Sequence, residues 1–149
     1  MVVSPDAGGL NRAKAFHKHF DYHGYGDGQV GLAMINKERK EANKIEKMEL
    51  VGNVEGKVCI LIDDMIDTAG TLCEAARVLK EKGAVKVYAF ASHGLFSGPA
   101  AERIRDSALE RVITTNSIPI SQKFKDTVGV KYQEVDIGML LAEAVRRVH

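Results

Sequence analysis

The sequence predicts an α/β fold in three layers, α/β/α, with a mostly parallel sheet of about five strands and flanking helices. Short β-branched runs alternate with segments of helical apolar spacing along the chain. This alternation implies right-handed crossovers between parallel strands. The run from Val58 to Ile62 is apolar at every position, as expected for a strand that is covered on both faces.

The first third of the chain alternates strand and helix with two loops between them. The Gly8-Gly9 pair marks a tight turn, and three further glycines mark a loop after the first helix. The expected elements are a strand ending at Val2-Val3, a helix from about Leu10 to Phe20, a loop from Tyr22 to Gln29, a strand from Gly31 to Ile35, a polar loop from Lys37 to Asn43 and a strand from Met48 to Val51.

The remaining elements continue the same pattern. The Lys82-Gly83 pair ends the central helix, because a basic residue followed by glycine is a common helix stop. The expected elements are a strand from Val58 to Ile62, a helix over Leu72 to Lys80, a strand from Val85 to Ala91, a helix from Pro99 to Ser107, a strand from Arg111 to Thr115, a strand from Lys131 to Val135 and a helix from Ile137 to Val148.

Composition is that of one ordinary globular domain spanning residues 1–149. Hydrophobic residues make up 45% and charged residues 28%, which excludes a disordered chain. The net charge of +1 gives no general reason to expect a nucleic-acid or membrane partner. Cys59 and Cys73 are interpreted as small buried hydrophobes, as suits a reducing compartment. We therefore expect a cytoplasmic protein without membrane or nucleic-acid partners.

The most informative segment follows the apolar run at Val58 to Ile62. Asp63 and Asp64 stand at the expected end of the strand, and Asp67-Thr68-Ala69-Gly70-Thr71 then opens a helix. Free backbone N–H groups and the helix dipole make such a turn an anion site, and glycine allows a phosphate to approach the backbone closely. Carboxylates beside an anion site favour sugar hydroxyls or a metal ion, so a phosphorylated sugar suits both parts. The alternative is an ordinary capped helix, since Asp and Thr are good N-caps.

This segment resembles the phosphoribosyl diphosphate (PRPP) signature of the type I phosphoribosyltransferase fold. Val2-Val3-Ser4-Pro5-Asp6-Ala7-Gly8-Gly9 and Ile35-Asn36-Lys37-Glu38-Arg39-Lys40 precede it, and all three motifs in this order resemble the ribose-phosphate pyrophosphokinase (PRPP synthetase) family. The resemblance covers essentially all 149 residues, as the carboxyl-terminal half of that enzyme. It implies a fragment that lacks the amino-terminal half.

The resemblance also implies roles for individual residues. Ribose 5-phosphate would bind to the acidic pair, whose family role is to hold the ribose hydroxyls, and to the turn, whose family role is to hold the 5′-phosphate. Lys37 and Arg39 would be catalytic, and Asp6 would lie near the metal ion. The implied substrate-binding residues are Asp63, Asp64, Asp67, Thr68, Ala69, Gly70 and Thr71, and the implied pyrophosphate loop is Asp6, Ala7, Gly8 and Gly9.

Several of these motifs have an ordinary structural alternative. The segment from Asp6 to Gly9 could be a tight turn with a capping Asp. The charge run from Lys37 to Lys40 could be solvated surface. The segments Ser92-His93-Gly94 and Thr114 to Pro119 end the later strands, and either capping or ligand contact would suit them.

The implied reaction transfers the diphosphoryl group of ATP to ribose 5-phosphate, giving PRPP and AMP for nucleotide biosynthesis, with Mg²⁺ as cofactor. The implied assembly is a homo-oligomer, with dimers building a hexamer. In the family the loop that holds ATP lies in the amino-terminal half, so the resemblance implies little or no activity for these residues alone. Two alternatives remain open: a non-catalytic PRPP-synthetase-associated regulatory protein, and a phosphoribosyltransferase that uses PRPP.

Overall fold

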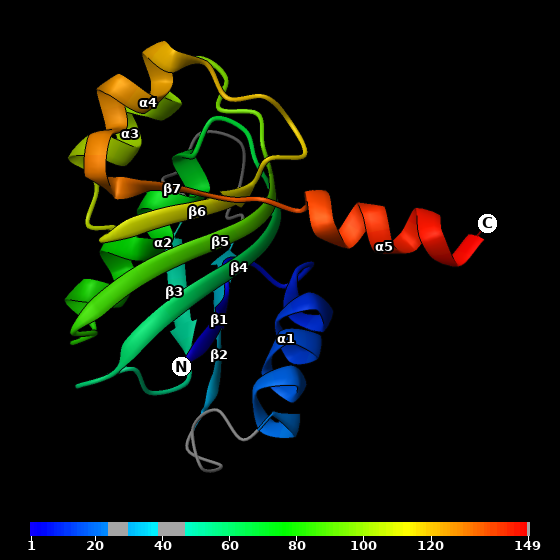
Figure 1. Cartoon of the computed structure of the whole chain (residues 1–149). Helices are drawn as coiled ribbons and strands as arrows, with labels where there is room; N and C mark the ends of the chain where they lie inside the picture. The colour runs from blue at the N-terminus through cyan, green and yellow to red at the C-terminus, as the bar shows by residue number, and fades with distance from the viewer. Residues whose placement is uncertain (24–29, 39–46, 149) are drawn as a thin grey trace.

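A computed structural model describes residues 1–23, 30–38 and 47–148. These residues form one seven-stranded sheet in the order β3-β2-β1-β4-β5-β6-β7 (Figure 1). All neighbouring strands are parallel except β2 and β3, which are antiparallel. The predicted mostly parallel α/β sheet is therefore confirmed. The strands are β1 (Val2–Ser4), β2 (Leu32–Glu38), β3 (Lys47–Val51), β4 (Val58–Ile66), β5 (Lys86–Gly94), β6 (Arg111–Thr115) and β7 (Tyr132–Val135).

The expected number of about five strands is wrong, because both short edge strands join the sheet. β3 pairs with β2 over five residues, and β7 pairs with β6 over four. Both edge segments were expected to be strands, so the error concerns how many of the expected strands join one sheet.

Helices cover both faces of the sheet, which confirms the three-layer arrangement. The structure adds α4, which was not predicted; the Ser121 hydroxyl caps it by accepting a hydrogen bond from the Phe124 N–H at 3.2 Å. The helices are α1 (Leu10–Tyr22), α2 (Gly70–Glu81), α3 (Ala100–Asp106), α4 (Gln122–Val128) and α5 (Gly138–Val148), with a short 3₁₀ turn at Gly129–Lys131.

The core lies on both sides of the sheet because successive strand residues alternate between its faces. On one face, Leu61 of β4 packs in a large cluster with residues of α2, α3 and α4. On the other face, Ile62 packs with Ala13 of α1 and with partly buried Phe16. A central strand that contributes to both clusters must be apolar throughout, which is the pattern that Val58 to Ile62 shows.

Among the strands that extend farther than the sequence suggests, two carry predicted site residues. β4 continues through Asp63 and Asp64 to Ile66, so the acidic pair lies within the strand and not at its end. β2 continues through Lys37, which pairs with Met48, so Lys37 is not in a loop. In both cases pairing with a neighbouring strand extends a segment whose own residues favour a loop.

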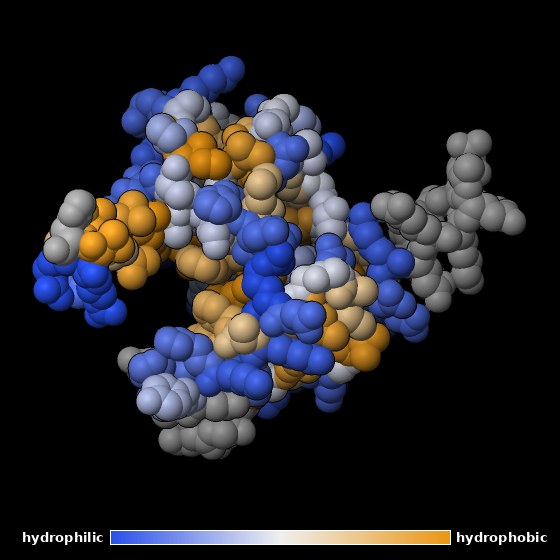
Figure 2. Space-filling view, turned by 90° about the vertical axis from the view of Figure 1, so that its right-hand side faces the viewer, coloured by the Kyte–Doolittle hydropathy of each residue, from blue (hydrophilic) through white to orange (hydrophobic). Residues whose placement is uncertain are grey.

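The last helix, α5, has no buried residue and projects away from the sheet (Figure 1). Its apolar side chains are therefore exposed, and Figure 2 shows this helix standing apart from the body with hydrophobic atoms on its flank. The large exposed residues are Met139, Leu140, Leu141, Val145 and Val148. Among the residues that the structure describes, no helix is both long enough and apolar enough to cross a membrane.

Replacement of Leu61 tests the central position of β4. Leu61 is fully buried, so Leu61→Ala should lower the free energy of unfolding by about 2–5 kcal/mol through lost burial and a residual cavity. Val58 begins the same strand and is 51% exposed, so Val58→Ala should cost less than about 1 kcal/mol. Urea denaturation measures both, and equal costs would contradict this description of the core.

Candidate functional site

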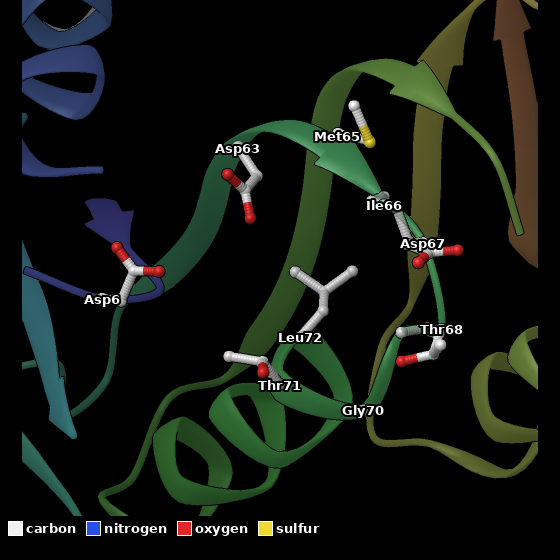
Figure 3. Close-up of a pocket in the computed structure, with 10 residues that line it drawn as sticks. Asp6, Asp63, Met65, Ile66, Asp67, Thr68, Gly70, Thr71 and Leu72 are labelled. Atoms are coloured by element: carbon white, nitrogen blue, oxygen red, sulfur yellow. The ribbon is translucent and has the colours of Figure 1, made fainter. Parts of the chain in front are cut away.

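A pocket of about 190 Å³ lies at the carboxyl ends of β1 and β4. In Figure 3, Asp6 and Asp63 lie on one side, Asp67 and Thr68 on the other, and Leu72 between them. The pocket therefore brings together three predicted segments from two neighbouring strands: one follows β1, one belongs to β4 and one follows β4. Its lining consists of Asp6, Asp63, Met65, Ile66, Asp67, Thr68, Ala69, Gly70, Thr71 and Leu72.

The topology of the sheet explains this position. β1 and β4 are neighbours in the sheet. From β1 the chain continues to β2 on one side, and from β4 it continues to β5 on the other side. Connections that leave in opposite directions open a crevice at the carboxyl ends of two adjacent parallel strands, where ligands bind in such sheets. Asp6 follows β1 and Asp63 belongs to β4, so the two carboxylates flank this crevice.

The acidic pair is bridged by Arg12 of α1. The two guanidinium nitrogens Nη1 and Nη2 lie 2.9 Å from Asp63 Oδ1 and 2.7 Å from Asp64 Oδ2. The Asp63 side chain is 27% exposed and lines the pocket, whereas the Asp64 side chain is 63% exposed and does not. The pair is therefore unequal: Asp63 faces the pocket and Asp64 faces the solvent beside it.

The two carboxyl groups also differ in pKa. Burial raises the pKa of Asp63 to about 6, against the opposing effects of the Asp64 backbone N–H and the Arg12 charge. Burial also acts on Asp64, but its hydrogen bond with Asp63 and the Arg12 charge outweigh that effect and hold its pKa below the usual value. At neutral pH both groups are mostly ionised, and below about pH 6 Asp63 takes up a proton first.

The turn before α2 has an unusual backbone. Ala69 adopts the left-handed conformation with φ of 59°, and Gly70 begins the helix. The first N–H groups of a helix have no acceptor within the helix and carry the positive end of its dipole. Thr68 and Thr71 add hydroxyl groups to the pocket lining. The turn therefore has backbone and hydroxyl groups that can donate hydrogen bonds to an anion.

The loop after β1 is held by its own hydrogen bonds. Asp6 Oδ1 accepts from the Gly9 N–H at 2.7 Å, and the Ser4 hydroxyl donates to the Asp6 carbonyl at 2.7 Å. A Cβ atom at Gly9 would lie 2.9 Å from Ser4 Oγ, so this position requires glycine. The tight-turn interpretation thus describes the internal contacts, and Asp6 also lines the pocket; Ala7, Gly8 and Gly9 do not.

Lys37 reaches the same region from β2. Its ammonium group donates a hydrogen bond to Thr71 Oγ1 at 3.3 Å, which places a positive charge beside the turn before α2. Arg39, the second residue with a predicted catalytic role, lies outside the described residues.

The carboxyl ends of β5 and β6, together with Ser117 just after β6, form a separate polar network. His93 Nδ1 lies 2.8 Å from Ser117 Oγ, and the Thr115 hydroxyl donates to the Ser92 carbonyl at 2.6 Å. None of these residues lines the pocket. Their observed contacts are those of turn chemistry.

Comparison with known proteins fits this geometry. Residues 32–149 match the family described as phosphoribosyl synthetase-associated domain, which covers most of the chain. The chain belongs to this family. It is also similar to the crystal structure of phosphoribosylpyrophosphate synthetase from Mycobacterium smegmatis, with 38% sequence identity and a TM-score of 0.83. That match covers 99% of this chain but 44% of the other, so this chain spans less than half of that relative.

Two phosphoribosyltransferase structures are more distant. The purine phosphoribosyltransferase from Pyrococcus horikoshii is 17% identical, with a TM-score of 0.48 over 91% of this chain and 68% of that one. A hypoxanthine-guanine phosphoribosyltransferase from Bacillus anthracis is 18% identical, with a TM-score of 0.46 over 62% of this chain and 53% of that one.

In this member of the phosphoribosyl synthetase-associated family, the carboxylates of the pocket suit a metal ion only when a bound ligand supplies further donor atoms. Among the described residues, no group of three or more His, Cys, Asp or Glu side chains could hold a metal ion. Mg²⁺ however is commonly held by one or two carboxylates together with substrate phosphates and water. Asp6 and Asp63, on one side of the pocket, suit that mode of binding.

Two arginines of this family member were missed by sequence reasoning. Arg12 bridges the acidic pair from 51 residues away, and Arg103 of α3 donates to the Thr68 carbonyl from 35 residues away at 3.0 Å. Neither lies in a recognisable motif. The hydrophobic lining residues Met65 and Leu72 were missed as well, because each is ordinary for its strand or helix.

Replacement of Arg12 tests the electrostatics of the acidic pair. The carboxyl group of Asp63 should titrate with a midpoint of about 6, and Arg12→Gln should raise this midpoint because the Arg12 charge lowers the pKa of Asp63. Carboxyl-carbon NMR titration measures the midpoint. Lys14→Gln, which removes the same charge from the same helix, is the control; equal shifts in both variants would contradict a specific role for Arg12.

Proposed function

We propose that this chain forms the ribose 5-phosphate site of a ribose-phosphate diphosphokinase. The observation that carries the proposal is the single pocket that unites Asp63 with the turn from Asp67 to Thr71, in a chain of this family. Carboxylates suit sugar hydroxyls, and the turn suits a phosphate. A sugar phosphate has both kinds of group and uses both parts of the pocket at once.

The proposed binding mode follows from the two sides of the pocket. The 5′-phosphate would accept hydrogen bonds from the N–H groups at the start of α2 and from the hydroxyls of Thr68 and Thr71. The ribose hydroxyls would donate to the Asp63 carboxylate across the pocket, with Asp64 beside it. The cavity of about 190 Å³ is below the size of typical drug-sized ligand pockets, which fits a small sugar phosphate.

The proposed reaction transfers a diphosphoryl group from ATP to the anomeric hydroxyl of ribose 5-phosphate. The anomeric oxygen forms a bond to the β-phosphorus, the bond from that phosphorus to the α-phosphate oxygen breaks, and AMP leaves. Such chemistry needs alignment and charge stabilisation more than covalent catalysis. Lys37, already beside Thr71, would neutralise charge on the transferring group, and Arg39 would assist.

Mg²⁺ would supply charge neutralisation on the phosphates when bound. Asp6 is the residue proposed to hold it, and Asp63 the neighbour that would contact it through water. ATP, oligomer formation and cytoplasmic location belong to the same proposal and rest on the family.

Calorimetric titration of ribose 5-phosphate with Mg²⁺ tests the site directly. The double variant Asp67→Ala, Thr71→Ala should bind at least about tenfold more weakly than the parent chain, because it loses the Thr71 hydroxyl donor and the Asp67 side chain at the start of the turn. The matched control is Asp126→Ala, Thr127→Ala on α4, which removes the same side chains outside the pocket lining. Equal heats in all three proteins would contradict the proposed site.

A second prediction concerns activity. With ATP, Mg²⁺ and ribose 5-phosphate, this chain should release no AMP above a protein-free control, because it spans less than half of the synthetase that it resembles. Chromatography of the nucleotides measures the release. Clear AMP release would show that these residues suffice for the reaction. Product from PRPP and a free base would instead favour a phosphoribosyltransferase.

A further inference from the structure

Three consecutive carbonyl groups, from the end of β4 into the turn before α2, face the segment that runs from the end of β5 into α3. The Ile66 carbonyl accepts from the Leu95 and Phe96 N–H groups at 2.9 and 3.2 Å, and the Asp67 carbonyl accepts from the Ser97 N–H at 3.1 Å. The third, the Thr68 carbonyl, accepts from Arg103 Nη1 at 3.0 Å. Residues 95–103, here named the supporting segment, therefore hold one side of the turn.

This arrangement sets the direction of the N–H groups. In a planar trans peptide the C=O and the following N–H point in opposite directions. A carbonyl fixed toward the supporting segment therefore turns the next N–H away from it. For Thr68 the next N–H belongs to Ala69, which lines the pocket.

The position of Ala69 is costly for the backbone. Ala69 has φ of 59°, a conformation that crowds Cβ against the following carbonyl and is favourable only for glycine. Such a residue persists only where surrounding contacts over-determine it, and strained residues cluster at functional sites. The Arg103 side chain of α3 donates to the carbonyl just before Ala69, and its Nη1 also lies 3.4 Å from the position of a Cβ at Gly70.

The supporting segment is itself anchored in the core. The Phe96 ring stacks on Phe124 with a centroid distance of 4.0 Å and meets the edge of Tyr132 at 5.8 Å. Phe96 also has a positive φ, of 51°, and a Cβ at Gly94 would collide with its ring. The supporting segment is therefore held in place by its own packing and can hold the turn.

We infer that Arg103 is a positioning residue for the phosphate turn. By holding the Thr68 carbonyl, it keeps Ala69 left-handed and keeps the N–H groups directed at the pocket. The inference deepens the proposed function and rests on it for the identity of the ligand, but its structural part concerns the turn alone.

Amide hydrogen exchange of the 149-residue chain tests the structural part without any ligand. The probes are the N–H of Ser97, bonded to the Asp67 carbonyl, and the N–H of Cys73, bonded to the Ala69 carbonyl. Arg103→Ala should speed exchange at both by about tenfold, since local opening becomes easier. Arg105→Ala, on the same helix but paired with Asp106, should leave both unchanged. Unchanged exchange in Arg103→Ala would overturn the inference.

Affinity for ribose 5-phosphate distinguishes positioning from direct attraction by the Arg103 charge. Arg103→Ala should weaken binding about tenfold in the parent chain. In an Ala69→Gly background the loss should be clearly smaller, because glycine adopts the left-handed conformation without strain. Equal losses in the two backgrounds would overturn the positioning role. If exchange responds as expected but the parent chain binds no ribose 5-phosphate, the positioning of the turn is supported and the proposed function fails.

Discussion

Parallel pairing between β4 and β5 continues as far as Ile66 and Gly94, and the candidate site depends on this continuation. Had β4 ended at Ile62, the acidic pair would stand in a loop and the turn would begin four residues earlier. The longer ladder instead half-buries Asp63 and brings the Ile66 carbonyl against the start of residues 95–103. Both the raised pKa of Asp63 and the support of the turn follow from that one extension.

The sequence was most informative where a structural feature depends on residues that are close together in the chain. The turn from Asp67 to Thr71 and the helix after it are specified by adjacent residues, so a short motif predicts them. The glycine turn after β1 is similar, since Gly9 is required by the closeness of Ser4. The mostly parallel sheet with helices on both faces was also predictable, because strands that are buried on both faces require continuous apolar runs.

What the sequence could not predict depends on contacts between distant residues. The lengths of β2 and β4 are set by their neighbouring strands and not by their own propensities. Arg12 and Arg103 reach the site from helices 51 and 35 residues away along the chain. An arginine on an exposed helix is ordinary by composition, and no local pattern distinguishes these two from Arg105, which pairs with its neighbour Asp106.

The charges of the pocket resolve an apparent conflict between acids and an anion site. Arg12 bridges Asp63 and Asp64, so it balances part of their negative charge. Lys37 adds a positive charge beside Thr71, on the side of the turn itself. Opposite charges at short range dominate over more distant like charges. The acids therefore need not repel a phosphate at the turn and stay available to hydroxyl groups.

The carbonyl groups on one side of the turn are hydrogen-bonded, and the N–H groups that begin α2 lie on the other side. Its carbonyls from Ile66 to Thr68 are bonded to residues 95–103, whereas the first N–H groups of α2 have no acceptor within their helix. Donors that are already directed need little reorganisation when a ligand arrives, and less binding energy is then lost to ordering. The strain at Ala69 is consistent with this division, because this left-handed residue lies between the bonded carbonyls and the N–H groups that begin α2.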